Sequence, residues 1–269
     1  MRRVPIFSII VLSLIFFISF FGGYFYDKSP YTLDKNSILL PPSLSHIFGT
    51  DRLGRDLFAR VIEGGKVSLI IGVGSALISS LIGLMVGVSS GFFKGKVDKF
   101  IVVLIDLFLT FPTFFLLLSL IAYMNASILI LVVVISITGW MGMARMIRSE
   151  SFAISNKPYI KVLKSAGVSR IKIILKYFTP ILAPIFLISF TFGVGGAILA
   201  ESGLSFLGIG IMPPQMSWGS ILSDGKDVVD IAWWLSFFPG LMIFLVIYAL
   251  SNISDYLQSI TNQKEISHE

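Results

Sequence analysis

Few side chains in this sequence are suited to catalysis, cofactor binding or metal coordination. The 269 residues include no cysteine, which excludes a disulfide framework and a thiolate metal site. The two histidines, His46 and His268, lie far apart, and neither belongs to a triad or to a metal-ligand spacing. A nucleotide-binding P-loop needs Gly, four residues and then Gly-Lys-Ser/Thr, whereas Gly65-Lys66 and Gly95-Lys96 are each followed by valine. We therefore expect no catalytic residue, no metal site and no cofactor bound by this chain.

Asp106 is the one carboxylate well inside a long apolar run. An ionisable group in lipid is costly unless it faces a partner or water, so such a residue is a candidate for a transport path. Asp106 also lies within about two helical turns of one end of its run, where a basic residue would pair with it. Both interpretations, a residue of the path and a structural ion pair, remain open.

A basic segment, 145–176, interrupts the apolar sequence. Within it, Asn156 is a suitable N-cap, Pro158 fits a first helical turn, and Gly167 suits the left-handed residue that ends a helix. These signals predict a short helix near 158–167. Its apolar residues share one stripe, with the polar residues off it: Tyr159, Val162, Leu163 and Ala166 against Lys161, Lys164 and Ser165. On physical grounds alone, this helix is either a docking element for a partner or an interfacial helix on anionic lipid.

The elements that position these residues are membrane helices. Of all residues, 55% are hydrophobic and 13% charged, and the mean hydropathy is +0.89, which is far from the averages of soluble proteins. Runs of roughly 20 apolar residues predict an all-α membrane protein with six transmembrane helices. The predicted spans are 5–25, 67–92, 99–123, 127–147, 176–200 and 231–253. The net charge of +6 lies in the gaps between these runs, which favours membrane orientation over nucleic-acid binding.

Lysine and arginine in short loops predict the orientation. The segment 145–176 carries eight Lys or Arg residues against one acid, Glu150, whereas 201–230 carries Lys226 against four acids. This asymmetry predicts that both termini and the segment 145–176 lie in the cytoplasm. The segment 26–66 is then outside, although its nearly balanced charges give little signal of their own.

Small residues recur every four positions along the second predicted span, a pattern that lets helix backbones approach closely. They are Ser68, Gly72, Ala76 and Ser80, continued by Gly83, Gly87 and Gly91. Packing within the chain is favoured over a subunit interface, because six helices must bury one another in either case. Prolines should kink or end several helices, namely Pro112, Pro180, Pro184 and Pro239.

The basic segment resembles the cytoplasmic coupling loop of ABC importer permeases. That signature has Glu-Ala-Ala, a glycine shortly after it and a later Leu-Pro, and this chain has the glycine as Gly167 and the proline as Pro180. The chain departs from the signature with Lys161-Val162-Leu163 at the triplet and Thr179 in place of the leucine. Any salt bridge that the family acid makes therefore cannot be carried over to Lys161.

Further matches extend from about residue 46 through nearly the whole remaining chain, and together they are far more specific than one short motif. They include Gly49-Thr50-Asp51-Arg52-Leu53-Gly54-Arg55-Asp56, Val97-Asp98, Phe111-Pro112, Ser205-Phe206-Leu207-Gly208-Ile209-Gly210, Pro213-Pro214, Ser217-Trp218-Gly219 and Phe238-Pro239-Gly240-Leu241. The chain resembles the dipeptide, oligopeptide and nickel permeases, in particular the C-type subunit of these binding-protein-dependent systems.

The resemblance implies the type I ABC importer permease fold, six transmembrane helices with a cytoplasmic coupling helix. The N-terminal helix and outer segment would occupy 1–66, the transmembrane core 67–256, with the coupling helix near 158–167, and the cytoplasmic tail 257–269. Contact with the ATPase is implied for Tyr159, Lys161, Val162, Leu163, Ala166 and Gly167. The candidates for the translocation path or gate are Asp106, Glu201, Ser205 and Phe206.

The resemblance also implies partners and a location. A homologous permease would complete a heterodimer, two ABC ATPase subunits would hold ATP and magnesium, and an extracytoplasmic binding protein would deliver the cargo. The expected location is the bacterial cytoplasmic (inner) membrane, in contact with lipid and with no nucleic acid. The cargo stays open between peptides and nickel or metal chelates. An autonomous channel or facilitator is the alternative function, but it would need no docking helix.

Overall fold

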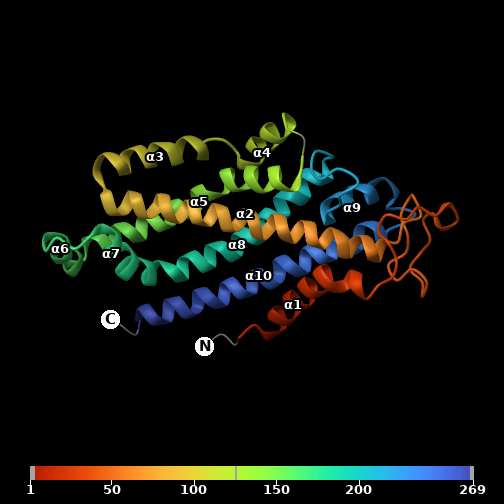
Figure 1. The fold of residues 1–269 in the computed structure, drawn as a ribbon, viewed down its shortest axis with the longest axis horizontal. Helices are drawn as coiled ribbons and strands as arrows, with labels where there is room; N and C mark the ends of the chain where they lie inside the picture. Colours follow the sequence, from red (N-terminus) through yellow and green to blue (C-terminus); the bar gives the residue numbers. More distant parts are fainter. Residues whose placement is uncertain (1–3, 125, 267–269) are drawn as a thin grey trace.

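The computed structural model describes residues 4–124 and 126–266, and this part of the chain is an elongated bundle of α-helices (Figure 1). One isolated antiparallel bridge joins Thr50 and Asp56, and no β-strand is formed within the described residues. The helices are α1 Ile6–Phe21, α2 Leu57–Phe93, α3 Gly95–Leu109, α4 Thr113–Ala122, α5 Ile128–Asn156, α6 Pro158–Ser165, α7 Arg170–Ile173, α8 Thr179–Phe206, α9 Trp218–Gly225 and α10 Trp234–Ile266.

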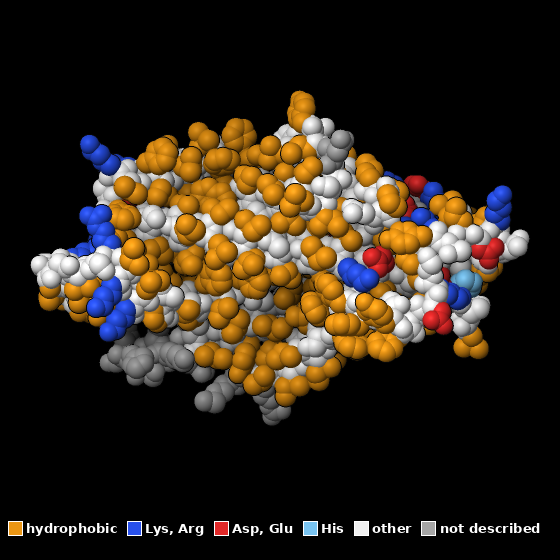
Figure 2. Space-filling model, viewed as in Figure 1, with side chains coloured by type: hydrophobic (Ala, Val, Ile, Leu, Met, Phe, Trp, Pro, Cys, Tyr) orange, Lys and Arg blue, Asp and Glu red, His pale blue; other side chains and the backbone are white. Residues whose placement is uncertain are grey.

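Five helical stretches in the described residues are long and apolar enough to cross a membrane. They are α1 with its short extension, α2, α5, the continuous stretch Arg170–Phe206 and α10, and the bent pair α3 and α4 makes a sixth if it counts as one span. Hydrophobic side chains cover the middle of the bundle, while Lys and Arg gather at the α6 end and mixed charges at the opposite end (Figure 2). The predicted all-α membrane fold is confirmed.

The third predicted span, 99–123, is not one straight helix. α3 and α4 are bent by 78° at a short break, and Pro112 is the residue that precedes α4. Proline lacks the N–H of a helical hydrogen bond and its ring collides with the preceding turn, so the helix direction changes there. α8 and α10, by contrast, continue through Pro184 and Pro239.

Several helices extend past their predicted spans, and α2 and α10 move two predicted domain boundaries. α2 has 37 residues and begins at Leu57, where the Asp56 side chain accepts a hydrogen bond from the Ala59 N–H at 2.9 Å. Hydropathy missed its first turns because they carry charged residues, which a helix can hold outside the bilayer. α10 likewise continues to Ile266, so the predicted boundaries after residues 66 and 256 both fall inside helices.

The small residues of α2 pack against two other helices of the chain. A Cβ atom on Gly72 would lie 2.5 Å from Ile198 of α8, and one on Gly87 would lie 2.7 Å from the Ala144 carbonyl oxygen and from the Ile147 Cβ of α5. Such separations leave no room for a side chain at either glycine, so the helices approach closely at both positions. The predicted use of this pattern for packing within the chain is confirmed.

The replacement Gly87→Ala is expected to destabilise the bundle by about 1–3 kcal/mol, because the added methyl group overpacks the contact with α5. Gly142→Ala is a matched control: a Cβ atom there meets nothing within 4 Å, and alanine favours a helix over glycine by about 0.5–1 kcal/mol. Thermal unfolding of the purified protein in detergent measures both changes. Equal midpoints for the two variants would contradict the proposed contact.

Candidate functional site: the α6 helix and the opposite end of the bundle

The short helix α6 follows α5 almost without a break. Its N-cap is Lys157, with Pro158 at the first helical position, and no side chain caps it. The prediction that Asn156 is the N-cap is wrong, because Asn156 is the last residue of α5 and its side-chain oxygen accepts a hydrogen bond from Lys94 Nζ at 2.7 Å. The proline fixes the start of α6 one residue later than the polar signal indicated.

The end of α6 has the predicted left-handed residue. Gly167 has φ of +73°, its N–H donates to the Lys164 carbonyl at 3.2 Å, and the Val168 N–H donates to the Leu163 carbonyl at 3.1 Å. The second bond closes the wide turn that commonly ends a helix at glycine. This turn reverses the chain so that α7 and α8 return into the bundle.

One side chain anchors α6 to the bundle. Ile160 is fully buried in an apolar cluster with Ile154, Ile173, Phe178 and Leu182, and Leu163 is partly buried against the same cluster. The predicted stripe omitted Ile160. The inward side of α6 is defined by residues 160 and 163, three positions apart, and this spacing was a signal for it.

The outward face of α6 holds most of the predicted stripe. Tyr159 is 42% exposed and Val162 is 66% exposed, while Lys161 and Ala166 are also exposed. Val162 is not among the apolar residues packed on the cluster that holds Ile160, so most of its side chain is uncovered within the described chain. The structure thus brings these predicted residues together on an uncovered surface.

α6 is also tied to the end of α2. Lys164 Nζ lies 4.0 Å from the centre of the Phe92 ring and donates to the Phe92 carbonyl at 3.3 Å. The Ser155 hydroxyl donates to the Gly91 carbonyl at 2.9 Å. Movement of α6 would therefore be transmitted to α2 and α5 together.

Two arginines of α5 bind carboxylates of α3. Arg148 donates to both oxygens of Asp98, from Nε at 2.6 Å and from Nη2 at 2.9 Å. Arg145 Nη2 donates to Asp106 at 2.7 Å, and both of these side chains are more than half exposed. Asp106 thus takes part in an ion pair, and its exposure also leaves it accessible from outside the chain.

At the opposite end, Glu201 and Ser205 lie inside the bundle. Glu201 is fully buried, and its carboxylate accepts hydrogen bonds from Ser205 at 2.7 Å and from Ser68 of α2 at 3.4 Å. The Ser68 hydroxyl in turn accepts from the Trp218 N–H of α9 at 3.1 Å. In this conformation the two predicted gate residues hold α2, α8 and α9 together rather than line an open surface.

Phe206 lies differently from its neighbours Glu201 and Ser205. Its side chain is 40% exposed and lines an open, mainly apolar groove of about 640 Å³. Residues of α4, α8, α9 and α10 form the walls, including Phe114 and Ile243. Among the four path or gate candidates, Phe206 and Asp106 are therefore the accessible ones.

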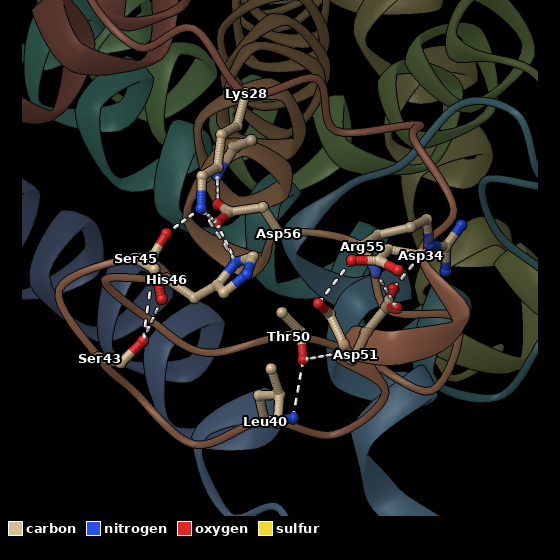
Figure 3. A network of polar contacts seen from close by, with 12 residues as sticks. Lys28, Asp34, Leu40, Ser43, Ser45, His46, Thr50, Asp51, Arg55 and Asp56 are labelled. Atoms are coloured by element: carbon tan, nitrogen blue, oxygen red, sulfur yellow. Dashed lines mark hydrogen bonds and ion pairs between the residues drawn. The ribbon is translucent and has the colours of Figure 1, made fainter.

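The segment between α1 and α2 is held by a polar network around Asp56 (Figure 3). Tyr26 donates to Asp56 Oδ2 at 3.0 Å, His46 Nδ1 lies 2.9 Å from the same oxygen, and Lys28 Nζ lies 3.6 Å from it. Burial and the Asp56 carboxylate raise the pKa of the Tyr26 hydroxyl well above its usual range. Within residues 4–124 and 126–266, no group of three or more His, Cys, Asp or Glu side chains is placed to hold a metal ion.

A second network joins this segment to α9. Arg55 Nε donates to the buried Asp51 at 2.7 Å, and Arg60 Nη1 donates to the same carboxylate. Arg60 Nη2 also donates to Asp224 of α9 at 3.0 Å. Sequence reasoning did not find this network, although the close spacing of acids and bases over residues 51–60 was a signal for it.

The fold defines the class of the protein, a polytopic α-helical membrane protein with the type I ABC importer permease fold. It is similar to a chain of the MetNI methionine ABC transporter in an inward-facing crystal form, with a TM-score of 0.59 at 17% identity over 76% of this chain and 97% of that chain. A second crystal form of the same transporter gives a TM-score of 0.56 at 16% identity over 73% and 95%.

Residues 79–265 match the model of the family described as the binding-protein-dependent transport system inner membrane component, and the chain belongs to this family. It is 35% identical to the dipeptide transport system permease protein DppC of Bacillus subtilis, over 96% of this chain and 81% of that protein. It is 32% identical to the oligopeptide transport system permease protein OppC of Haemophilus influenzae, over 98% and 86%. OppC of Mycobacterium bovis is 36% identical over 87% and 80%. The resemblance inferred from the motifs is confirmed.

The two arginine pairs predict different effects of removing a carboxylate charge. Asp98→Asn should destabilise the protein by about 1–3 kcal/mol, because it breaks a two-bond, partly buried pair. Asp106→Asn should cost less than about 1 kcal/mol, because its pair with Arg145 is exposed. Thermal unfolding in detergent distinguishes them, with Arg148→Lys as a variant that keeps the charge but loses the paired geometry. A larger loss for Asp106→Asn would contradict this ranking.

Proposed function

We propose that this chain is one of two permease subunits of an ATP-driven importer that carries peptides across the bacterial inner membrane. A homologous second permease would complete the translocation path, and an extracytoplasmic binding protein would deliver the cargo. Family membership supports the assignment. Peptides are the proposed cargo because the similar proteins include a dipeptide and two oligopeptide permeases.

α6 is proposed as the element that couples transport to ATP hydrolysis on separate ATPase subunits, where ATP and magnesium would bind. The observation that carries this proposal is an anchored helix at the end of the bundle whose Val162 is exposed while Ile160 is fully buried. A channel that worked alone would have no use for an apolar surface placed beyond the spans. Closure of the ATPases would push α6 and, through it, α2 and α5.

The α6 end is proposed to be cytoplasmic, with both termini on that side, because its loops carry most of the Lys and Arg residues. The segment between α1 and α2 would then face the binding protein. Exposed Asp106 and Phe206 are proposed to border the path shared with the second permease. Glu201 and Ser205 would act through α9, whose position they hold.

Val162→Asp should abolish ATP-dependent uptake and ATPase binding while the bundle stays folded, because a carboxylate replaces an exposed apolar contact. Val162→Ile keeps the apolar surface and should retain both activities. Uptake of labelled di- and oligopeptides by cells carrying the whole system, together with ATPase co-purification, provides the measurement. Leu163→Asp is a less specific test, because Leu163 also packs inside the chain.

The proposal fails if Val162→Asp transports peptide like the unmodified protein, or if uptake continues when the ATPases are absent. Competition by nickel, with none by peptides, would leave the permease assignment in place and overturn the proposed cargo.

A further inference from the structure

The α6 end of the molecule has a large excess of positive charge. From Ser151 to Lys176 the chain contains no Asp or Glu and six Lys or Arg residues. Of the acids near this end, Asp98 and Asp106 are already bound by arginines of α5, and Glu150 of α5 forms no ion pair with a cation of α6 within the described residues. Within the described residues, no ion pair joins Lys157, Lys161, Lys164 or Arg170 to a carboxylate, and blue side chains gather at this end in Figure 2.

Some of these cations border the outward face of α6. At 100° per residue, Lys161 lies to one side of Val162 and Tyr159 to the other, and all three side chains are exposed. Lys157 is exposed immediately before the helix. Any partner that covers Val162 must therefore also cover, and partly desolvate, at least one lysine.

A second group of cations surrounds the end of α2. Lys164 lies over the Phe92 ring, and Arg170 lies 5.5 Å from the centre of the Phe93 ring. The pKa of the Lys164 ammonium is lowered, first by burial and then by repulsion from Lys94 and Arg170. This repulsion has no carboxylate to relieve it in the described part of the chain.

We propose that α6 docks into an acidic groove of the ATPase subunit, whose carboxylates pair with Lys157, Lys161 and the Lys94–Lys164–Arg170 group around an apolar contact to Val162. The inference rests on the proposed function. Covering these cations with a neutral or basic surface would leave unpaired charges at the interface. The free energy of desolvating them would exceed the free energy gained from the apolar contact with Val162.

An anionic membrane surface would also attract these lysines, and it is the competing explanation. The ATPase is favoured because α6 lies at the extreme end of the molecule, beyond the ends of α2, α3 and α8 (Figure 1). An interfacial helix would instead turn its apolar side toward the spans and lipid, whereas Val162 faces away from the buried Ile160.

The test uses the whole importer, with Lys157→Glu/Lys161→Glu compared with the original protein. We expect the affinity for the ATPase to fall about tenfold or more in the double variant, since charge pairs at interfaces are strongly coupled. In the original protein, this affinity should fall with rising salt. Lys96→Glu/Lys99→Glu is the control, because it makes the same charge change on the exposed start of α3. Replacing an acidic residue of the ATPase groove by lysine should restore binding of the Lys157→Glu/Lys161→Glu variant.

Each outcome is decisive when binding is measured both in detergent and in nanodiscs of phosphatidylcholine alone or with phosphatidylglycerol. Unchanged, salt-independent affinity in the double variant overturns the acidic groove while leaving ATPase coupling intact. A loss confined to phosphatidylglycerol discs assigns the lysines to lipid and also overturns it. If the unmodified chain retains no ATPase at any salt concentration, the proposed function itself fails.

Discussion

The close contact between α2 and α5 is the constraint on which the rest of the structure depends. In lipid, apolar side chains gain little by leaving their surroundings, so helix association relies on short backbone separations. Gly83, Gly87 and Gly91 provide them along one side of α2. At the last of these glycines the same contact continues as the Ser155 hydrogen bond, so the packing that holds the bundle also places α6.

The charged residues are used differently at the two ends. Near the segment between α1 and α2, acids and bases satisfy one another, as in the bonds of Arg60 to Asp51 and Asp224. Near α6, the cations outnumber the acids, and those on α6 have no carboxylate within the described chain. At the end near the α1–α2 segment, the charges are therefore neutralised within the chain. At the α6 end, the excess of cations suits a surface that binds an acidic partner.

The sequence predicted the helical membrane fold, the break at Pro112 and the left-handed Gly167, because each depends on local chemistry. It placed the start of α2 and the N-cap of α6 less well, since hydropathy excludes charged turns and Pro158 made Lys157 the N-cap in place of Asn156. The burial of Glu201 and Ile160 depends on contacts between distant segments, such as Ser68 with Trp218. A single sequence gives periodicity, but it does not say which neighbour each face meets.

The length of α2 has a mechanical consequence. Its 37 residues make a rod of about 55 Å at 1.5 Å per residue. One tip carries Arg60 and its bonds to Asp51 and Asp224, and the other carries Phe92 under Lys164. If α6 couples to an ATPase as proposed, a tilt imposed at the α6 end of this rod would also shift the contacts of Arg60 at the far end. The two ends of the bundle would then change together rather than independently.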